Sequence, residues 1–478
     1  MRKLLLISIC LFTFCTPALA RQNSAKFETS ACPFDIPSGE TEGSTIECGM
    51  LTVPEDHNAP DGTQIQLAVA HIHSTSDSPA PDPVIYLSGG PGDSALSDVE
   101  SWVDTPIRDQ HDIILLDQRG TGSSQPALNC ESSADNDATK ACHDKLVADG
   151  VNLSDYNSIQ SADDVADLRQ ALGYDEWNLL GISYGTRLSL VIMRDHPEGI
   201  RSVILDSVYP PQINDWEEYA ADQTNTFAHV FAGCAADTAC NQAYPDLEKV
   251  FYDTVVKLND QPATYISAKG DSVTLSGDDL TEAIFQALYV TQNIPYLPKV
   301  FYEVSQGNYT ILDDLKSGDI LNKGRQDSND DGAAGLYNSV TCSEELPFDN
   351  YDKAIANAKA ARPELRDGAV AAVQSMYDTC AIWDVTPAPA IEAKPVSSAI
   401  PTLVLAGEYD PATPVAWSQD AAKTLSHSFF FEFPGSGHAV IDSGDCAKTM
   451  MVAFLADPTS EPDSSCIADM TEPQFVTK

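Results

Sequence analysis

The sequence predicts an α/β protein in which a mostly parallel β-sheet is covered by helices. Short, mainly apolar runs are typical of strands that are buried on both faces, as parallel strands are. A helical pattern lies between two of these runs, which is the alternation that an α/β sheet requires. The apolar runs cover residues 84–87, 113–116, 177–180, 203–205 and 403–405.

The first twenty residues predict a signal peptide (residues 1–20). Arg2 and Lys3 precede an apolar run over 4–15, which is too short to span a bilayer as a helix. The sequence Ala18-Leu19-Ala20 has the small-x-small pattern that signal peptidase cleaves. A membrane anchor is the alternative, but nothing further on extends the apolar stretch. We therefore expect export to a secreted or periplasmic location.

The chain is strongly acidic, with 71 Asp and Glu against 27 Lys and Arg and a formal net charge of −44. Removal of the signal peptide takes away Arg2 and Lys3 and leaves a net charge of −46. Such a surface repels nucleic acid and anionic membranes, so we expect neither as a partner of the mature chain. We interpret the acidity as a source of solubility.

Ten cysteines follow the signal peptide. An even number in an exported protein favours disulfides over metal sites or a thiol nucleophile. The cysteines fall in local pairs, so we expect sequential neighbours to bond, although spacing alone does not fix the connectivity. The ten are Cys32, Cys48, Cys130, Cys142, Cys234, Cys240, Cys342, Cys380, Cys446 and Cys466.

Two alternating segments, 46–53 and 65–73, predict an antiparallel hairpin at the start of the mature chain. Apolar and polar side chains alternate in both, and turn residues lie between them. Further along, Ser161 is expected to cap a helix that ends at Gly173. This helix lies between the second and third apolar runs.

Residues 212–396 interrupt the α/β alternation and predict an inserted, mainly helical cap domain. Its candidate helices cover 216–230, 247–258, 280–289 and 354–361. The predicted organisation is therefore a signal peptide (1–20), a first part of the core (21–211), the cap (212–396) and a second part of the core (397–478).

The strongest local signal is Gly181-Ile182-Ser183-Tyr184-Gly185, which follows an apolar strand and opens a helical run. This placement predicts a nucleophile elbow, a sharp strand-to-helix turn that lifts a serine hydroxyl above the sheet. Both glycines are needed because side chains there would clash with neighbouring backbone. We expect Ser183 to be a nucleophile.

A nucleophilic serine needs a base, and the base needs a carboxylate that orients it. With this type of elbow the chain order is serine, acid, histidine. Asp410 lies in a loop after one predicted strand, and His438 follows a last strand in a glycine-flanked turn. We expect these residues to complete a triad, with Glu408 as the rival acid. The remaining histidines lack this context and are interpreted as structural.

The segment Ser88-Gly89-Gly90-Pro91-Gly92 follows another buried strand, upstream of the elbow. A glycine-rich turn there can offer backbone N–H groups to a developing oxyanion. We predict an oxyanion hole formed by the N–H groups of Gly90 and Tyr184. An ordinary tight turn is the alternative.

Four motifs are spread over nearly the whole mature chain: Gly89-Gly90-Pro91-Gly92, Asp117-Gln118-Arg119-Gly120-Thr121-Gly122, Gly181-Ile182-Ser183-Tyr184-Gly185-Thr186 and Gly407-Glu408-Tyr409-Asp410-Pro411-Ala412-Thr413-Pro414. Together they resemble secreted tripeptidyl aminopeptidases and their prolyl iminopeptidase relatives. The resemblance implies an α/β-hydrolase fold and an exopeptidase that acts on peptides with a free N-terminus, without a metal or organic cofactor. Prolyl iminopeptidases usually carry histidine where this chain has Ser88, which favours the tripeptidyl branch.

An aminopeptidase must bind a cationic amine, which calls for carboxylates at the mouth of the site. In the family that the motifs resemble, acids of the cap have this role. Thr341-Cys342-Ser343-Glu344-Glu345 is the best match, because a disulfide at Cys342 could fix the adjacent acids. We expect Glu344 and Glu345 to bind the amine, with an exposed acidic pair as the alternative.

Residues 327–332 match the first half of a calcium loop, but Asn338 stands where the bidentate glutamate belongs. We therefore favour a solvated cap loop and assign no metal ligand.

Three classes of function remain. An exopeptidase is favoured, a carboxylester hydrolase or lipase with the same triad is second, and a non-catalytic binding protein is third because the triad is intact.

Overall fold

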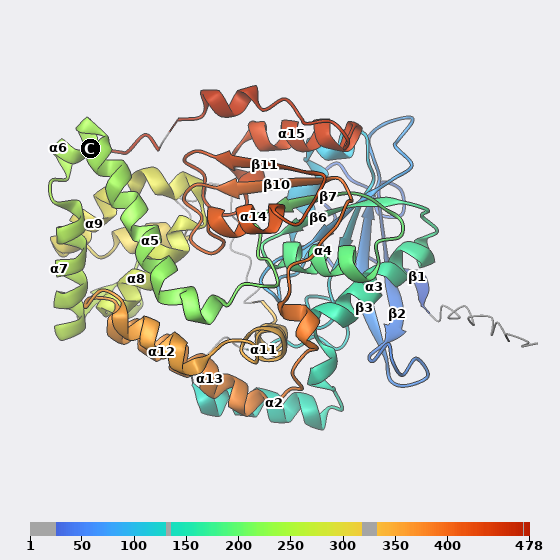
Figure 1. Cartoon of the computed structure of the whole chain (residues 1–478), viewed down its shortest axis with the longest axis horizontal. Helices are drawn as coiled ribbons and strands as arrows, with labels where there is room; N and C mark the ends of the chain where they lie inside the picture. Colours follow the sequence, from blue (N-terminus) through green and yellow to red (C-terminus); the bar gives the residue numbers. More distant parts are fainter. Residues whose placement is uncertain (1–24, 131–134, 318–331, 472) are drawn as a thin grey trace, which may run out of the picture.

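The computed structural model describes residues 25–130, 135–317, 332–471 and 473–478. Within these residues a nine-stranded sheet has the strand order β1-β2-β3-β5-β4-β6-β7-β10-β11 (Figure 1). Strands β1, β2, β3 and β5 pair antiparallel, and from β5 to β11 all neighbours are parallel. The α/β class and the N-terminal hairpin are thereby confirmed. The strands are β1 (Lys26–Ser30), β2 (Ile46–Pro54), β3 (Gln64–Ile72), β4 (Val84–Leu87), β5 (Ile113–Leu116), β6 (Trp177–Ile182), β7 (Ile200–Asp206), β10 (Thr402–Gly407) and β11 (Ser428–Phe433).

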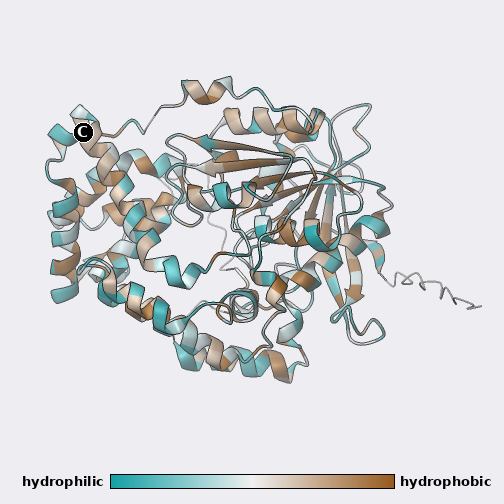
Figure 2. Cartoon of the chain, viewed as in Figure 1, coloured by the Kyte–Doolittle hydropathy of each residue, from teal (hydrophilic) through white to brown (hydrophobic). Residues whose placement is uncertain are grey.

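Each face of the sheet carries its own apolar core. Successive residues of β5 alternate between the two: Ile113 and Leu115 pack in one core, and Ile114 and Leu116 pack in the other. All four side chains are at most 1% exposed. A strand with a core on both sides needs apolar residues at every position, and Figure 2 shows the central strands in brown.

Helices on both faces close these cores. α1 (Val99–Val103) and α15 (Asp445–Ala456) contribute Trp102, Met450 and Phe454 to one core. The other core receives side chains from α3 (Ser158–Leu172), α4 (Tyr184–Asp195) and α14 (Val415–Ala422).

The predicted start of α3 is wrong, whereas its end is confirmed. Asn157 is the N-cap, and its side chain accepts a hydrogen bond from the Gln160 N–H. Ser161 instead lies inside the first turn and is only 2% exposed. Gly173 ends the helix in the left-handed conformation, with φ of +80°.

A long segment, residues 207–401, lies between two strands that are neighbours in the sheet. β10 pairs with β7 in parallel, with Thr402 opposite Val203. All four predicted cap helices are present, and a hairpin of β8 (Ala263–Ile266) and β9 (Ser272–Leu275) adds to them. The bounds of the cap as a separate domain remain a prediction. The helices of this segment are α5 (Asp215–Ala236), α6 (Thr238–Ala243), α7 (Leu247–Asp260), α8 (Gly277–Leu288), α9 (Leu297–Ser305), α10 (Ile311–Ser317), α11 (Ala334–Val340), α12 (Tyr351–Ala360) and α13 (Arg366–Trp383).

The inserted segment has an apolar core of its own. Phe227, Phe251 and Phe301 lie at its centre and are at most 1% exposed. The ring of Phe251 is 5.3 Å from that of Phe227 and 4.6 Å from that of Phe301 between centroids. Across the described part of the chain, which also includes α2 (Asn136–Ala148), no helix has the length and apolarity needed to cross a membrane.

The ten cysteines form disulfides between sequential neighbours, as predicted. The bridges are Cys32–Cys48, Cys130–Cys142, Cys234–Cys240, Cys342–Cys380 and Cys446–Cys466. Stable disulfides are typical of oxidising compartments outside the cytosol. The fourth bridge ties the Thr341–Glu345 turn to α13.

Removal of the Cys342–Cys380 bridge should destabilise the protein measurably. In a Cys342→Ala/Cys380→Ala double variant we expect the free energy of unfolding to fall by about 2–4 kcal/mol, because the bridge spans 38 positions and restricts the unfolded chain. Denaturant titration followed by circular dichroism measures this. The Cys234→Ala/Cys240→Ala variant removes a bridge over 6 positions and should lose less. A larger loss in that control would contradict the loop-length argument.

Candidate active site

Ser183 occupies a strained turn between β6 and α4. β6 ends at Ile182 and α4 begins at Tyr184, so Ser183 alone makes the change of direction. Its backbone has φ of +57° and ψ of −126°, a conformation that side-chain-bearing residues rarely adopt. The predicted elbow is therefore present in the geometry, at the carboxyl edge of the parallel strands.

Both glycines of the elbow are required by close backbone contacts. A Cβ atom on Gly185 would lie 1.9 Å from the carbonyl oxygen of Leu87, and one on Gly181 would lie 2.3 Å from that of Gly185. A side chain at Gly185 would force α4 away from β4, and one at Gly181 would force β6 away from α4. This agrees with the reason given for the two glycines from the sequence.

His438 and Asp410 are in direct contact. The Nδ1 atom of His438 lies 2.9 and 2.8 Å from the two carboxylate oxygens of Asp410. The same carboxylate accepts bonds from the N–H groups of Ala412 and Thr413 and from the Thr413 hydroxyl. Burial alone would raise the pKa of Asp410, but His438 and these bonds outweigh it and hold that pKa below its ordinary value. Asp410 is thus a fixed anion beside the imidazole.

Glu408, the rival acid, is engaged elsewhere. One of its carboxylate oxygens lies 3.1 Å from His229 Nε2, and the other accepts the Gly435 N–H at 2.7 Å. The geometry therefore brings Asp410, and not Glu408, to His438.

The end of β7 joins the serine turn to the histidine loop. The N–H of Ser183 donates to the carbonyl oxygen of Asp206 at 3.1 Å. The two carboxylate oxygens of Asp206 accept the N–H groups of Val440 and Ile441, each at 2.9 Å. The next residue, Ser207, accepts the N–H of Ala439 at 2.9 Å. One strand end thus holds Ser183 and the segment that follows His438.

Asp206 is a site residue that was not predicted from the sequence. Its signal was an acidic residue at the carboxyl end of a buried apolar run, the same edge at which Ser183 was expected. Asp206 is 0% exposed. Burial raises its pKa to about 7, although the two backbone N–H donors and the nearby His438 act to lower it.

The inserted segment packs against His438 from the other side. Tyr289 follows α8, and its ring lies 4.9 Å from the imidazole between centroids, at 60°. The carbonyl oxygen of Tyr289 accepts the His438 N–H at 3.1 Å. Residues of the insertion therefore help to form the site.

The glycine-rich turn after β4 lies against Ser183. A Cβ atom on Gly89 would be 3.0 Å from Ser183 Cβ and 3.5 Å from its Oγ. Gly90 has φ of +101°, a conformation that favours glycine. On the other side of Ser183, Tyr184 is the first residue of α4, and N–H groups at a helix start have no acceptor within the helix. The turn that contains Gly90 and the start of α4 at Tyr184 both adjoin Ser183, and the oxyanion hole stays a prediction.

Two charged residues of the second motif have structural contacts. Asp117 accepts bonds from the Ser94 hydroxyl and the Leu96 and Ser123 N–H groups, so it braces the glycine-rich turn. Arg119 forms a bidentate pair with Asp164, with both N–O distances at 2.7 Å.

The prediction that Glu344 binds a substrate amine is corrected by the structure. One of its oxygens accepts the Ser158 N–H at 2.5 Å, and the other accepts the Ser158 hydroxyl at 2.8 Å and Arg187 Nε at 3.2 Å. The side chains of Glu344 and Arg187 are both 0% exposed. Glu344 therefore neutralises a buried arginine of α4 and has no free oxygen for a ligand.

Glu345 belongs to a group of partly buried acids beside α4. Burial raises the pKa of Glu345, and nearby Arg187 and the Tyr209 hydroxyl lower it only in part. Burial and the charge of Glu345 raise the pKa of Asp215 well above its ordinary value. Burial raises the pKa of Asp222 and of Asp349 to about 7 each, with further contributions from neighbouring glutamates. Glu345, Asp222 and Asp349 thus all act on Asp215, and Arg187 is a counter-charge to Glu345.

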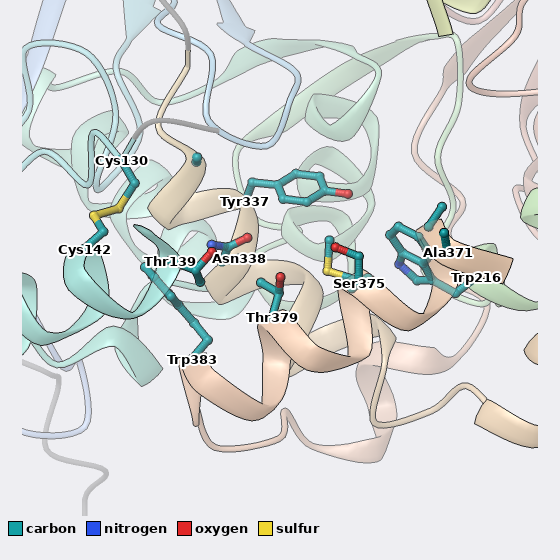
Figure 3. Close-up of a pocket in the computed structure, with 13 residues that line it drawn as sticks. Cys130, Thr139, Cys142, Trp216, Tyr337, Asn338, Ala371, Ser375, Thr379 and Trp383 are labelled. Carbon is teal, nitrogen blue, oxygen red and sulfur yellow. A yellow bond between two sulfur atoms is a disulfide. The ribbon is translucent and has the colours of Figure 1, made fainter. Parts of the chain in front are cut away.

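A cavity of about 450 Å³ lies between α2, α11, α13 and the start of α5 (Figure 3). Trp216 and Tyr337 belong to its wall and also to the surroundings of Glu345. In Figure 3 the Tyr337 ring points along the cavity towards Trp216. The wall is mostly apolar and consists of Cys130, Thr139, Cys142, Trp216, Ala334, Tyr337, Asn338, Ala371, Ala372, Ser375, Met376, Thr379 and Trp383. Of the segment expected to be a solvated cap loop, residues 327–331 lie outside the described residues.

Comparison with known proteins agrees with this geometry. A model of the α/β-hydrolase fold matches residues 82–445. The chain belongs to the α/β-hydrolase fold family.

Its relatives include proteins named as peptidases and a protein named as a carboxylesterase. Serine protease Hip1 of Mycobacterium tuberculosis is 28% identical over 488 positions, which cover 92% of this chain and 90% of that protein. Carboxylesterase B of the same organism is 28% identical over 468 positions (89% and 86%). Tripeptidyl aminopeptidase of Streptomyces coelicolor is 26% identical over 432 positions (83% and 77%). The chain is a serine hydrolase of this fold.

Replacement of the elbow serine should abolish activity without loss of the fold. For Ser183→Ala we expect kcat/KM to fall by at least about a thousandfold and labelling by a fluorophosphonate to disappear, with an unchanged melting temperature. Ser207 also has a positive φ, of 60°, and Ser207→Ala is the matched control that should keep its label. A label on Ser207 in the wild type would overturn the assignment of Ser183.

The pKa of Asp206 predicts a stability that depends on pH. Its folded pKa of about 7 lies above the ordinary value of about 4, so between these values the folded state binds more protons than the unfolded state. Its contribution to stability is therefore present below about pH 4 and is lost as the pH rises through about 7. The free energy of unfolding of Asp206→Asn should therefore fall less steeply between about pH 4 and 7 than that of the wild type. The two slopes should differ by up to about 1.4 kcal/mol per pH unit.

Denaturant titrations at several pH values measure how the free energy of unfolding changes with pH. Asp457→Asn changes an exposed carboxyl group whose pKa is lowered by its neighbours Ser460 and Thr459, so this control should keep the wild-type slope. Parallel curves for wild type and Asp206→Asn would show that Asp206 keeps its ordinary pKa in the folded state.

Proposed function

We propose that the chain is an exported serine exopeptidase, secreted or periplasmic, that releases tripeptides or single residues from the free N-terminus of peptides. The observation that carries this proposal is the group of acids around Glu345, which contacts Arg187 of the helix that directly follows Ser183. The family and the relatives establish hydrolysis, and the acids select the substrate.

The triad residues act in the order that their contacts suggest. Ser183 Oγ attacks the carbonyl carbon, and His438 takes its proton and then delivers it to the leaving amine. Asp410 holds Nδ1, which leaves Nε2 as the ring atom that exchanges this proton. The N–H groups of Gly90 and Tyr184 stabilise the oxyanion. A water molecule, deprotonated by His438, then cleaves the acyl-enzyme and releases the peptide fragment.

The acids provide a site for an ammonium group. Burial raises the pKa of Glu345, Asp215, Asp222 and Asp349, and Glu345 further raises the pKa of Asp215 and of Asp349. Since Arg187 already pairs with Glu344, the region retains an excess of carboxyl groups. A bound cation favours the charged form of each acid, so a protonated N-terminus gains affinity here.

Glu345 is connected to the elbow through few residues. The Tyr209 hydroxyl is close to Glu345, and the Tyr209 N–H donates to Thr186 Oγ1 at 2.8 Å. The Thr186 N–H in turn donates to the Ser183 carbonyl at 2.9 Å. A short peptide whose N-terminus lies at Glu345 therefore has its scissile bond near Ser183.

The apolar cavity supports a product longer than one residue. Its volume of about 450 Å³ is within the range that ligand pockets occupy, and its aromatic wall suits apolar side chains. The relative from Streptomyces coelicolor is named a tripeptidyl aminopeptidase, which is consistent with three residues between the amine and the scissile bond.

A carboxylester hydrolase or lipase is the second candidate. The same triad and oxyanion donors cleave esters, and carboxylesterase B of Mycobacterium tuberculosis is 28% identical to this chain. An ester substrate has no ammonium group, so this alternative leaves the acids without a role in substrate binding.

Neutralisation of Glu345 separates the two candidates. For Glu345→Gln we expect kcat/KM on tripeptide anilides with a free amine to fall by at least about tenfold, because a charge-assisted bond of about 1.5–3 kcal/mol is lost. N-acetylated anilides should be poor substrates of the wild type and insensitive to the change. A small neutral ester, which needs only the triad, should react nearly as before.

Glu344→Gln is the matched control, one residue away. It breaks a buried ion pair, so it should lower the free energy of unfolding by about 3–5 kcal/mol. Glu345→Gln should leave stability unchanged or higher, because burial disfavours its charged form. Ready cleavage of N-acetylated peptides by the wild type would favour the esterase or an endopeptidase.

A further inference from the structure

Glu47, His71 and His73 form a cluster on one face of the antiparallel part of the sheet. Glu47 of β2 is directly opposite His71 of β3, and His73 lies two positions further on, where its N–H donates to the Thr45 carbonyl at 2.9 Å. Residues two apart in a strand point to the same face. The three side chains therefore converge because of strand register.

The spacing of these side chains matches that of metal ligands. One nitrogen or oxygen atom from each residue lies within 4.8 Å of the other two. His73 Nε2 is 3.8 Å from Glu47 Oε1, and the two imidazole rings are 4.2 Å apart between centroids. With metal–ligand bonds of about 2.0–2.1 Å, the ligands of a tetrahedral zinc ion are about 3.4 Å apart. Small side-chain rotations would shorten the distance between His73 Nε2 and Glu47 Oε1 from 3.8 Å to this value.

A second carboxylate orients the histidines. Asp112 Oδ2 lies 2.7 Å from His71 Nε2 and 3.5 Å from His73 Nδ1, and Asp112 Oδ1 accepts the Ser74 N–H at 2.8 Å. The Tyr174 hydroxyl is 3.4 Å from His71 Nε2. Metal-binding histidines are typically held in this way by a carboxylate on the second ring nitrogen.

The cluster lies at the opposite end of the sheet from Ser183. Asp112 directly precedes β5, whereas Ser183 directly follows β6, and both strands are parallel to β4. The side chains are also accessible, with Glu47 48% and His73 32% exposed. This cluster therefore takes no part in the hydrolytic site.

We propose that Glu47, His71 and His73 bind one divalent transition-metal ion of the zinc class, with Asp112 as the carboxylate that orients the imidazoles. Two neutral imidazoles and a carboxylate suit Zn²⁺. The ion joins β2 to β3 and, through Asp112, to the start of β5, so it stabilises the fold. Binding requires neutral histidines and therefore releases protons when the pH is low.

Titration of the chelator-treated full chain with Zn²⁺ tests the proposal, by calorimetry and by native mass spectrometry. At about pH 7.5 we expect one ion per chain and a higher melting temperature, with binding lost near pH 5 as the histidines are protonated. Co²⁺ should give the visible absorption of a tetrahedral site. His73→Ala and the conservative Glu47→Gln should each weaken binding by at least about tenfold.

His427→Ala is the matched control, since His427 is also exposed and its Nδ1 lies 2.9 Å from the Ala399 carbonyl oxygen, away from the cluster. It should bind Zn²⁺ like the wild type. Retained esterase or peptidase activity shows that each variant is folded. Absence of Zn²⁺ binding by the wild type, or unchanged affinity in both His73→Ala and Glu47→Gln, would overturn the proposal and leave the cluster as a set of ion pairs between His71 and Asp112.

Discussion

The hydrogen bonds of Asp206 connect the turn that carries Ser183 to the loop that carries His438. The strand end that accepts the Ser183 N–H also carries the carboxylate that accepts the Val440 and Ile441 N–H groups. Ser183 and His438 come from chain segments more than 250 positions apart, yet Ser183 and the residues that follow His438 are fixed to the same residue. The close contact of Gly185 with Leu87 presses α4 onto the sheet and completes this frame. Loss of the Asp206 bonds, or of the close contact between Gly185 and Leu87, would change the position of Ser183 directly.

The acids of the cap show how burial separates two adjacent and identical residues. Glu344 lies opposite Arg187 and gives up its ligand-binding capacity to keep that arginine neutralised in the interior. Glu345, one position on, turns towards Tyr209 and Asp215 and remains in a region with too little positive charge. Removing one partner of a buried pair is far more costly than neutralising an acid that already resists ionisation. The first acid therefore supports the fold, whereas the second remains able to interact with a cation.

Local patterns carried the prediction of the sheet and of the elbow. The apolar runs, such as 113–116, have a core on each face, and the elbow glycines are required by contacts within a few residues of the motif. The predictions were wrong where contacts between residues far apart in the sequence determine the role of a side chain. Ser161 and Asn157 are both good caps, and the choice depended on Ser161 being buried by the rest of the fold. The choice between Glu344 and Glu345 depended on Arg187, which is 157 positions away from Glu344. Asp206 lacked any motif because its role comes from loops that the tertiary fold brings to it.

The place at which residues 207–401 leave the sheet has a bearing on how such enzymes diversify. β7 and β10 are parallel neighbours with Asp206 opposite Leu405, so the segment leaves at the carboxyl end of one strand and returns to the amino end of the next, about 10 Å along the strand direction. A segment anchored in this way can lengthen, shorten or be exchanged at the cost of loop closure alone, which grows slowly with length. Neither the register of the sheet nor the elbow has to change. Substrate selectivity can thus change through the inserted segment, while the sheet and the nucleophile elbow stay the same.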